Sequence, residues 1–306
     1  MSYLVSINVL KIEMGVNLFY LSTLFVIFAS SIILFLISSK LNQKKAHRLV
    51  LILLFMNFVL HFCKILIPPY LHDFPSSLKV ITPDNICAFS AVFFPFMYLS
   101  KNKYLRDYMA YLGTASGIAV FLFPGSYLDF NVIDFGSVIE VSRFYISHLL
   151  LTLGPVAMLG SKLHTLNHRR AYAVPLIFLF VLTYIGLNEV FLKLSGITNA
   201  SWQDIFSNNY RNGALVFGPM STLDESLGKF YFLILPFFKY YYPGTQDLYY
   251  IPVLWLALPV FVFFSLGAFL LSLLYTKRQA CLDYKSYKQK RKMRLTYKRS
   301  LKIVSE

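Results

Sequence analysis

The sequence predicts an all-α polytopic membrane protein, a bundle of seven transmembrane helices with its N-terminus outside and its C-terminus in the cytoplasm. Hydrophobic residues make up 57% of the 306 residues and charged residues only 14%, which is far less charge than soluble domains carry. The apolar residues gather in runs of about 20, the length that crosses a ~30 Å hydrocarbon core. The basic residues then fall in alternate connections between these runs. This pattern indicates a multi-pass protein of the cell membrane.

The apolar runs divide the chain into a membrane domain of residues 1–275 and a basic cytoplasmic tail of residues 276–306. The first run is no cleavable signal, because it is too long and only Lys11 precedes it as a basic residue. The apolar segment 230–238 is too short to cross, so we expect it to be interfacial or re-entrant. The predicted spans are about 16–39, 49–68, 84–100, 105–124, 140–161, 172–194 and 250–275.

Charge decides the orientation of these spans. The connections after the first, third and fifth spans hold four, three and three Lys or Arg residues, and the tail holds eleven, which together are 21 of 29. The opposite connections carry the acidic residues Asp73, Asp129, Asp134, Asp204, Asp224 and Asp247. Basic residues favour the cytoplasmic side of the membrane. The first connection and the tail are therefore predicted inside, and the N-terminus outside.

Polar residues within the spans gather in the predicted outer half. They are Asn57, His61 and Lys64 in the second span, Asp84, Asn85 and Cys87 in the third, Glu140, Arg143, Ser147 and His148 in the fifth, and Tyr184, Asn188 and Glu189 in the sixth. A conduction path needs polar groups at the midplane and beyond it. The pattern instead predicts a cavity open to the outer leaflet and closed toward the cytoplasm. The alternative is that Lys64, Arg143 and Glu189 extend to the interface and that His61 only packs between helices.

Cys87 and His148 are the candidate reactive pair. We expect Thr82 to cap the third span and Pro83 to take its first position, which places Cys87 near the positive end of the helix dipole. A Cys–His pair is the minimal unit for nucleophilic acyl transfer. The three cysteines show no metal-ligand spacing, and neither a metal nor a cofactor is expected. A disulfide between Cys63 and Cys87 is the open alternative.

Small residues and prolines indicate how the helices pack. Gly113 and Gly117 form a small-xxx-small pattern in the fourth span, which predicts close contact with another helix. Pro95, Pro155 and Pro259 predict kinks in the third, fifth and seventh spans.

Several short motifs carry a resemblance to a known family. A proline is followed by the helix-opening Cys87; then come Tyr111-Leu112-Gly113, Phe123-Pro124, Arg143-Phe144-Tyr145-Ile146-Ser147-His148, Asn209-Tyr210, and Leu223-Asp224 with Gly228. Over roughly residues 80–275 the chain resembles the YwaF-type integral membrane proteins, whose eukaryotic relative is the transmembrane protein 164 family. Lys229-Phe230 stand where a Trp-Pro pair is usual in that family.

The resemblance implies a lipid acyltransferase that moves an acyl chain between glycerophospholipids through an acyl-cysteine. By position, Cys87 takes the place of the nucleophile and His148 that of the histidine. The resulting hypothesis is a membrane-embedded lipid acyltransferase or acyl hydrolase acting on outer-leaflet phospholipids. Asn85 or Ser147 would stabilise an oxyanion and Asn188 would orient the base, with His61 also in the site. The Phe-rich inner half beneath the site would supply a slot for the acyl chain.

Two other functions stay open from the sequence. A transporter or a lipid- or small-molecule-binding protein would use the same cavity without chemistry and depend on Asn57, His61 and Lys64. A membrane assembly factor would act through the tail, whose basic residues attract anionic headgroups at ~1 kcal/mol each. No motif predicts nucleic-acid binding, and no signal indicates an oligomeric state.

Overall fold

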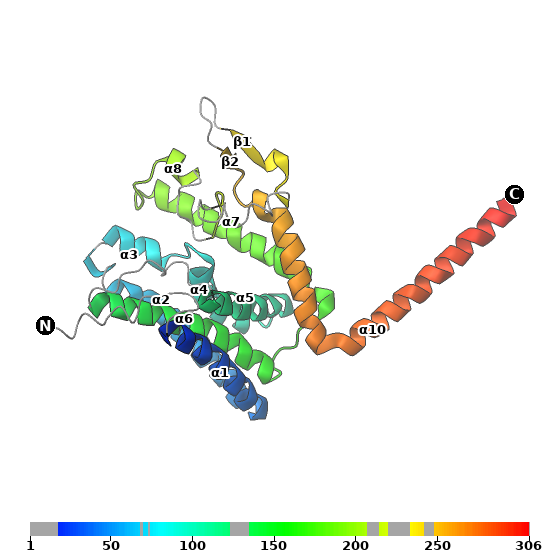
Figure 1. Ribbon diagram of the computed structural model, residues 1–306, viewed down its shortest axis with the longest axis horizontal. Coiled ribbons are helices and arrows are strands. Elements are labelled where there is room, and N and C mark those ends of the chain that lie inside the picture. Colours follow the sequence, from blue (N-terminus) through cyan, green and yellow to red (C-terminus); the bar gives the residue numbers. More distant parts are fainter. Residues whose placement is uncertain are drawn as a thin grey trace.

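The computed structural model describes residues 18–67, 70–72, 74–122, 135–206, 214–219, 233–241 and 248–305, and it is mostly helical. A helix lies at each of the seven predicted positions (Figure 1). They are α1 (Leu18–Lys40), α2 (Gln43–Phe62), α4 (Ile86–Leu99), α5 (Lys103–Leu122), α6 (Phe135–Gly160), α7 (Ala173–Leu194) and α10 (Ala257–Ser305). By length and composition, four described segments can cross a membrane: α1, α2 with the turn that follows it, α7, and 254–294. The protein is therefore a helical multi-pass membrane protein.

α6 lies at the centre of the bundle. It packs against α1, α2 and α5, while α4 lies against α2 and α5, and α7 contacts α4, α5 and α10 (Figure 1). The core includes Phe94, Tyr108, Leu151 and Leu182, which are fully buried. Large apolar side chains on the outer faces of α1, α2, α7 and α10 are exposed, as expected of surfaces that face lipid.

Two glycines bring α5 and α6 into close contact, as the small-xxx-small pattern predicts. A Cβ atom at Gly113 would lie 2.5 Å from Pro155 Cγ and 2.9 Å from the Leu151 carbonyl oxygen. A Cβ atom at Gly117 would collide with the Thr152 hydroxyl. Close backbone approach compensates for the weak hydrophobic drive between helices in lipid. α5 and α6 are thus in close contact where Gly113 and Gly117 meet residues 151–155 of α6.

A buried ionic cluster ties α5 to the connection between α6 and α7. The Asp107 carboxylate accepts hydrogen bonds from His164 Nε2 at 2.7 Å and Arg170 Nε at 2.5 Å. Asp107 is only 3% exposed, and a buried carboxylate needs such partners to offset the loss of hydration. The cluster lies at the end of the bundle that carries the basic connections.

The seventh helix begins later than predicted. Residues 248–250 form strand β2 (Leu248–Tyr250), which pairs antiparallel with β1 (Lys239–Tyr241), and α10 starts at Ala257 after a short 3₁₀ turn. Pro259 therefore lies in the first turn of α10 and does not interrupt it, because the first turn needs no amide donor. The hairpin is a small departure from the all-α prediction.

The apolar segment 230–238 is only partly within the described residues. Its described part, from Leu233, leads through a 3₁₀ turn (Pro236–Phe238) into β1. Ile234 packs against Tyr250 and Trp255. Whether this segment enters the membrane stays a prediction. The family motifs at 123–124, 209–210 and 223–228 lie outside the described residues.

The basic tail continues α10. The helix has non-helical backbone angles at Thr276 and then projects away from the bundle (Figure 1). His168 hydrogen-bonds to Thr276 and Asp283, both at 3.0 Å, and Arg169 donates to both Asp283 carboxylate oxygens. These contacts fasten the start of the tail to the α6–α7 connection.

Candidate functional site

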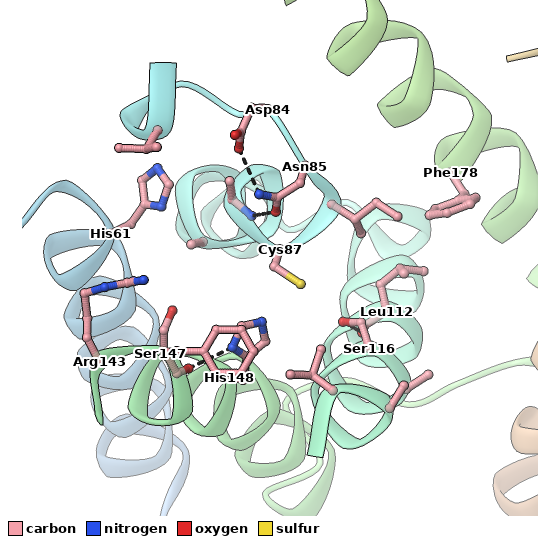
Figure 2. A pocket seen from close by; sticks show the side chains of 18 of the residues that line it. His61, Asp84, Asn85, Cys87, Leu112, Ser116, Arg143, Ser147, His148 and Phe178 are labelled. Carbon is pink, nitrogen blue, oxygen red and sulfur yellow. Dashed lines mark hydrogen bonds between the residues drawn. The ribbon is translucent and has the colours of Figure 1, made fainter. Parts of the chain in front are cut away.

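A cavity of about 740 Å³ lies between α2, α4, α5 and α6 and extends to α7 and α10. This volume falls in the range of small-molecule sites, roughly 300–1,000 Å³. One end is charged and polar, with His61, Lys64, Asp84, Glu140 and Arg143 in its lining. The other end is apolar. Both members of the predicted reactive pair line the same cavity, and the close-up shows them on opposite walls (Figure 2).

Cys87 is the second residue of α4. The helix cap is Asn85 and not Thr82 as predicted: Asn85 is extended, and its Oδ1 accepts a hydrogen bond from the Ala88 amide at 2.9 Å. The Asp84 amide bonds back to the Thr82 carbonyl at 2.8 Å, so residues 82–84 form a turn that keeps Thr82 out of the helix. Asparagine is also the better cap of the two. The thiol is therefore closer to the positive helix end than the sequence suggested.

His148 lies on α6, and its ring is oriented by the backbone. Nδ1 is 2.8 Å from the Phe144 carbonyl oxygen, which can only accept, so Nδ1 carries the hydrogen and Nε2 of the neutral ring carries a lone pair. The Thr152 hydroxyl donates to the His148 carbonyl at 3.0 Å. Gly117 of α5 lies against that carbonyl too. The α5–α6 contact thus sets the height of His148 in the bundle.

The thiol and the imidazole face each other across the cavity. The Cys87 side chain points inward from α4, and the ring nitrogen of His148 that is not bonded to Phe144 lies on the side of the sulfur (Figure 2). Cys87 and Cys63 are both free thiols, so the alternative of a disulfide is wrong. Cys63 lies in the 3₁₀ turn after α2 and does not line the cavity. Among the described residues, no His, Cys, Asp or Glu group is arranged to hold a metal.

The predicted supporting residues are already bonded. Ser147 lines the cavity, but its hydroxyl donates to Asn57 Oδ1 at 2.7 Å. Asn85 caps α4, and its amide donates to Asp84 at 2.8 Å. The single hydroxyl hydrogen of Ser147 is therefore used, while the Asn85 amide has a second N–H donor besides the one bonded to Asp84.

Asn188 does not reach His148. Its amide donates to Thr82 Oγ1 at 2.9 Å, and the Phe144 carbonyl holds the His148 ring instead. Because this acceptor is the main-chain carbonyl of Phe144, the pattern of side chains in the sequence could not predict it. His61 is buried in the cavity wall, with Nε2 3.0 Å from the Ile81 carbonyl.

The charged end of the cavity is internally paired. Arg143 donates to both Glu140 oxygens at 2.6 Å, and Lys64 donates to the Val80 carbonyl at 3.3 Å. Glu189 is buried and lies 4.0 Å from Lys79. Arg143 therefore has an opposite charge one turn away on α6, and Glu189 lies near the partly exposed Lys79. Whether either side chain extends to the membrane interface stays a prediction.

Other lining residues were not singled out from the sequence. Tyr70, at the charged end, follows two prolines in a stretch without periodicity. Phe178, Phe264 and Gly267 line the apolar end. Gly267 is the one glycine in the seventh predicted span. This was the sequence signal from which space beside that helix could have been predicted.

The comparisons with known proteins place the chain in a family. The family model named TMEM164 family matches residues 13–246. No curated protein and no solved structure matches the chain. The matched range includes the whole Cys87 and His148 region and most of the cavity. Because it covers well over half of the 306 residues, this protein belongs to the TMEM164 family.

Proposed function

We propose that the protein is a membrane-embedded lipid acyltransferase or acyl hydrolase, with Cys87 as the nucleophile and His148 as the general base. The observation that carries the proposal is the free thiol of Cys87 facing a histidine whose tautomer is fixed by the Phe144 carbonyl. The resemblance to the eukaryotic transmembrane protein 164 branch of the family supplies the reaction class.

The reaction divides into two acyl transfers. His148 Nε2 takes the thiol proton while the Cys87 sulfur attacks the ester carbonyl carbon of a phospholipid. The tetrahedral intermediate then breaks its C–O bond, and His148 returns the proton to the departing lysolipid alcohol. This leaves an acyl-cysteine thioester. In the second transfer, a lysolipid hydroxyl or water gives its proton to His148 and attacks the thioester, and Cys87 leaves and takes the proton back.

Main-chain donors at the start of α4 support the oxyanion better than side chains do. The first amides of a helix have no intrahelical acceptor, and the helix dipole favours negative charge there. The Ala88 amide donates to the Asn85 side chain. The two preceding amides of α4, those of Ile86 and Cys87, lie beside the thiol and are the donors proposed for the oxyanion. The nucleophile itself thus belongs to the segment that would stabilise the developing charge.

The proposal includes the membrane arrangement predicted from charge. All seven helices would cross the membrane, with the N-terminus outside and the basic connections in the cytoplasm. The charged end of the cavity then faces the outer leaflet of the cell membrane. Its lining from α2, α4 and α6 comes from the helix ends opposite the Asp107 cluster, which supports this arrangement.

The test is acyl exchange on a labelled phospholipid by the purified full-length protein. Cys87→Ala and His148→Ala should each lower turnover at least about 100-fold, since each removes an essential proton-transfer or nucleophilic group. Cys63→Ala is the matched control, because it removes the other partly buried free thiol from outside the cavity. A lysolipid acceptor or water alone distinguishes transfer from hydrolysis. Wild-type turnover in both Cys87→Ala and His148→Ala would refute the mechanism.

A further inference from the structure

The apolar end of the cavity forms an arm that leaves Cys87 on the side opposite the charges. Figure 2 shows Leu112, Ser116 and Phe178 on one side of Cys87, and His61 and Arg143 on the other. Side chains of α5, α7 and α10 line the arm: Tyr111, Leu112, Ala115, Phe178, Phe264 and Gly267. Phe178 belongs to the Phe-rich inner half that was predicted to supply a slot for the acyl chain. On α4, Phe89 and Phe93 are stacked on each other and pack edge-on against Tyr184, so that part of the inner half is filled by packing.

The arm reaches the surface of the bundle that faces lipid. Phe263 of α10 lines the cavity and is 48% exposed. Next to it, the rings of Phe178 and Phe264 stack at 4.3 Å between centroids and form one wall. An apolar chain that entered here would pass from the bilayer to the thiol without crossing the charged end.

Gly267 leaves room in the arm where other glycines are tightly packed. A Cβ atom at Gly267 would meet only the Tyr111 ring, with Oη at 3.8 Å and Cε1 at 4.0 Å. These are ordinary contact distances, so a Cβ atom could be added without moving the helices. A Cβ atom at Gly113, Gly117, Gly154 or Gly160 would instead lie closer than 3.0 Å to a neighbouring atom, so that neighbour would have to move. Helix packing explains those four glycines and does not explain Gly267.

We propose that this arm binds the acyl chain of a membrane lipid whose ester lies at Cys87, and that the missing side chain at Gly267 sets which chains fit. The inference rests on the proposed acyl chemistry and deepens it by assigning the chain-binding site. The polar part of the lipid then lies at the charged end. Apolar lining suits the occupant, because an acyl chain has no polar group that needs a partner.

The test uses alkylation of Cys87, which needs no turnover. In full-length protein carrying Cys63→Ser and Cys281→Ser, Cys87 adds across the double bond of N-ethyl-, N-octyl- or N-hexadecylmaleimide in detergent micelles. We expect faster labelling with longer chains. Gly267→Phe should slow the hexadecyl probe about tenfold or more and leave the ethyl probe nearly unchanged, since side-chain volume discriminates between apolar ligands by such factors. Gly267→Leu should be labelled by the hexadecyl probe at a rate between those of the parent protein and Gly267→Phe.

The control is Leu266→Phe, which adds the same ring on a neighbouring position that is 55% exposed and outside the cavity lining. It should label like the parent protein. The inference would be overturned if the labelling rate of the parent protein did not depend on the chain length of the maleimide. It would also be overturned if Gly267→Phe showed the same dependence as the parent. Thermal unfolding identifies a misfolded variant, and in that case Gly267→Leu decides.

Labelling and turnover separate the two proposals. If Cys87-dependent acyl exchange is absent but Gly267→Phe abolishes chain-length dependence, the chain site stands and the proposed function fails. If exchange occurs and its acyl-chain profile is the same in Gly267→Phe, the proposed function stands and the chain site fails.

Discussion

Replacing Gly117 by alanine tests whether the α5–α6 contact positions His148. The added Cβ would collide with the Thr152 hydroxyl and lie 3.1 Å from the His148 carbonyl oxygen. Neither neighbour is the end of a flexible chain, so the two helices must separate. Overpacking of this kind costs about 1–3 kcal/mol. We expect a lower melting temperature in detergent and a larger loss of acyl exchange than the stability change alone produces, because His148 moves with α6.

A double-mutant cycle isolates the collision. Thr152→Ala alone should cost about 1 kcal/mol, because it removes the hydrogen bonds to the His148 and Gly113 carbonyls. Combined with Gly117→Ala it removes the colliding oxygen, so the double variant should be more stable than the sum predicts, by roughly 0.5–3 kcal/mol. Gly267→Ala is the matched control for the melting temperature alone, since its Cβ would have no atom closer than 3.8 Å. A Gly117→Ala protein that melts and turns over like the wild type would refute the reasoning.

Substitutions at three further polar sites, Asn85, the Glu140–Arg143 pair and Asp107, are tested by thermal unfolding. Asn85→Ala should destabilise the protein by about 1 kcal/mol and Asn85→Asp by much less, since aspartate also caps helices; equal losses would contradict the capping role. Glu140→Gln should cost about 3–5 kcal/mol by leaving Arg143 buried without its charge partner, and adding Arg143→Met should restore part of it. Asp107→Asn should cost a similar amount at the other end of the bundle, and an unchanged melting curve would show that its two basic partners are dispensable.

The helices were predictable because their signals are local. Apolar runs of membrane length marked α1, α2, α7 and α10, and each run contains enough residues to outweigh an uncertain edge. The Gly113 and Gly117 spacing predicted the contact with α6 for the same reason. The start of α10 was misplaced because the strand of residues 248–250 is apolar too, and an apolar run does not distinguish a short buried strand from a helix turn.

The site was predictable only in part. The sequence predicted Cys87 and His148 in the same outer half of the membrane, and the structure places both in one cavity. Their orienting contacts depend on neighbours distant in sequence or on backbone atoms. Asn57 reaches Ser147 across 90 residues, and Phe144 holds His148 through its carbonyl. Side-chain patterns contain neither kind of information. They did not predict that Ser147 bonds to Asn57 or that Asn188 bonds to Thr82, and the roles of both residues in the reaction stay predictions.

The way α10 is held has a mechanical consequence. Before its first turn, the Trp255 indole donates to the Leu215 carbonyl, and at Thr276 the helix bonds to His168. Between these attachments Val260 and Ala268 are buried in the core, and Phe264 stacks on Phe178. α10 carries neither Cys87 nor His148, although it lines the apolar end of the cavity. A change in the position of α10 would therefore alter the apolar end and leave the facing pair in place.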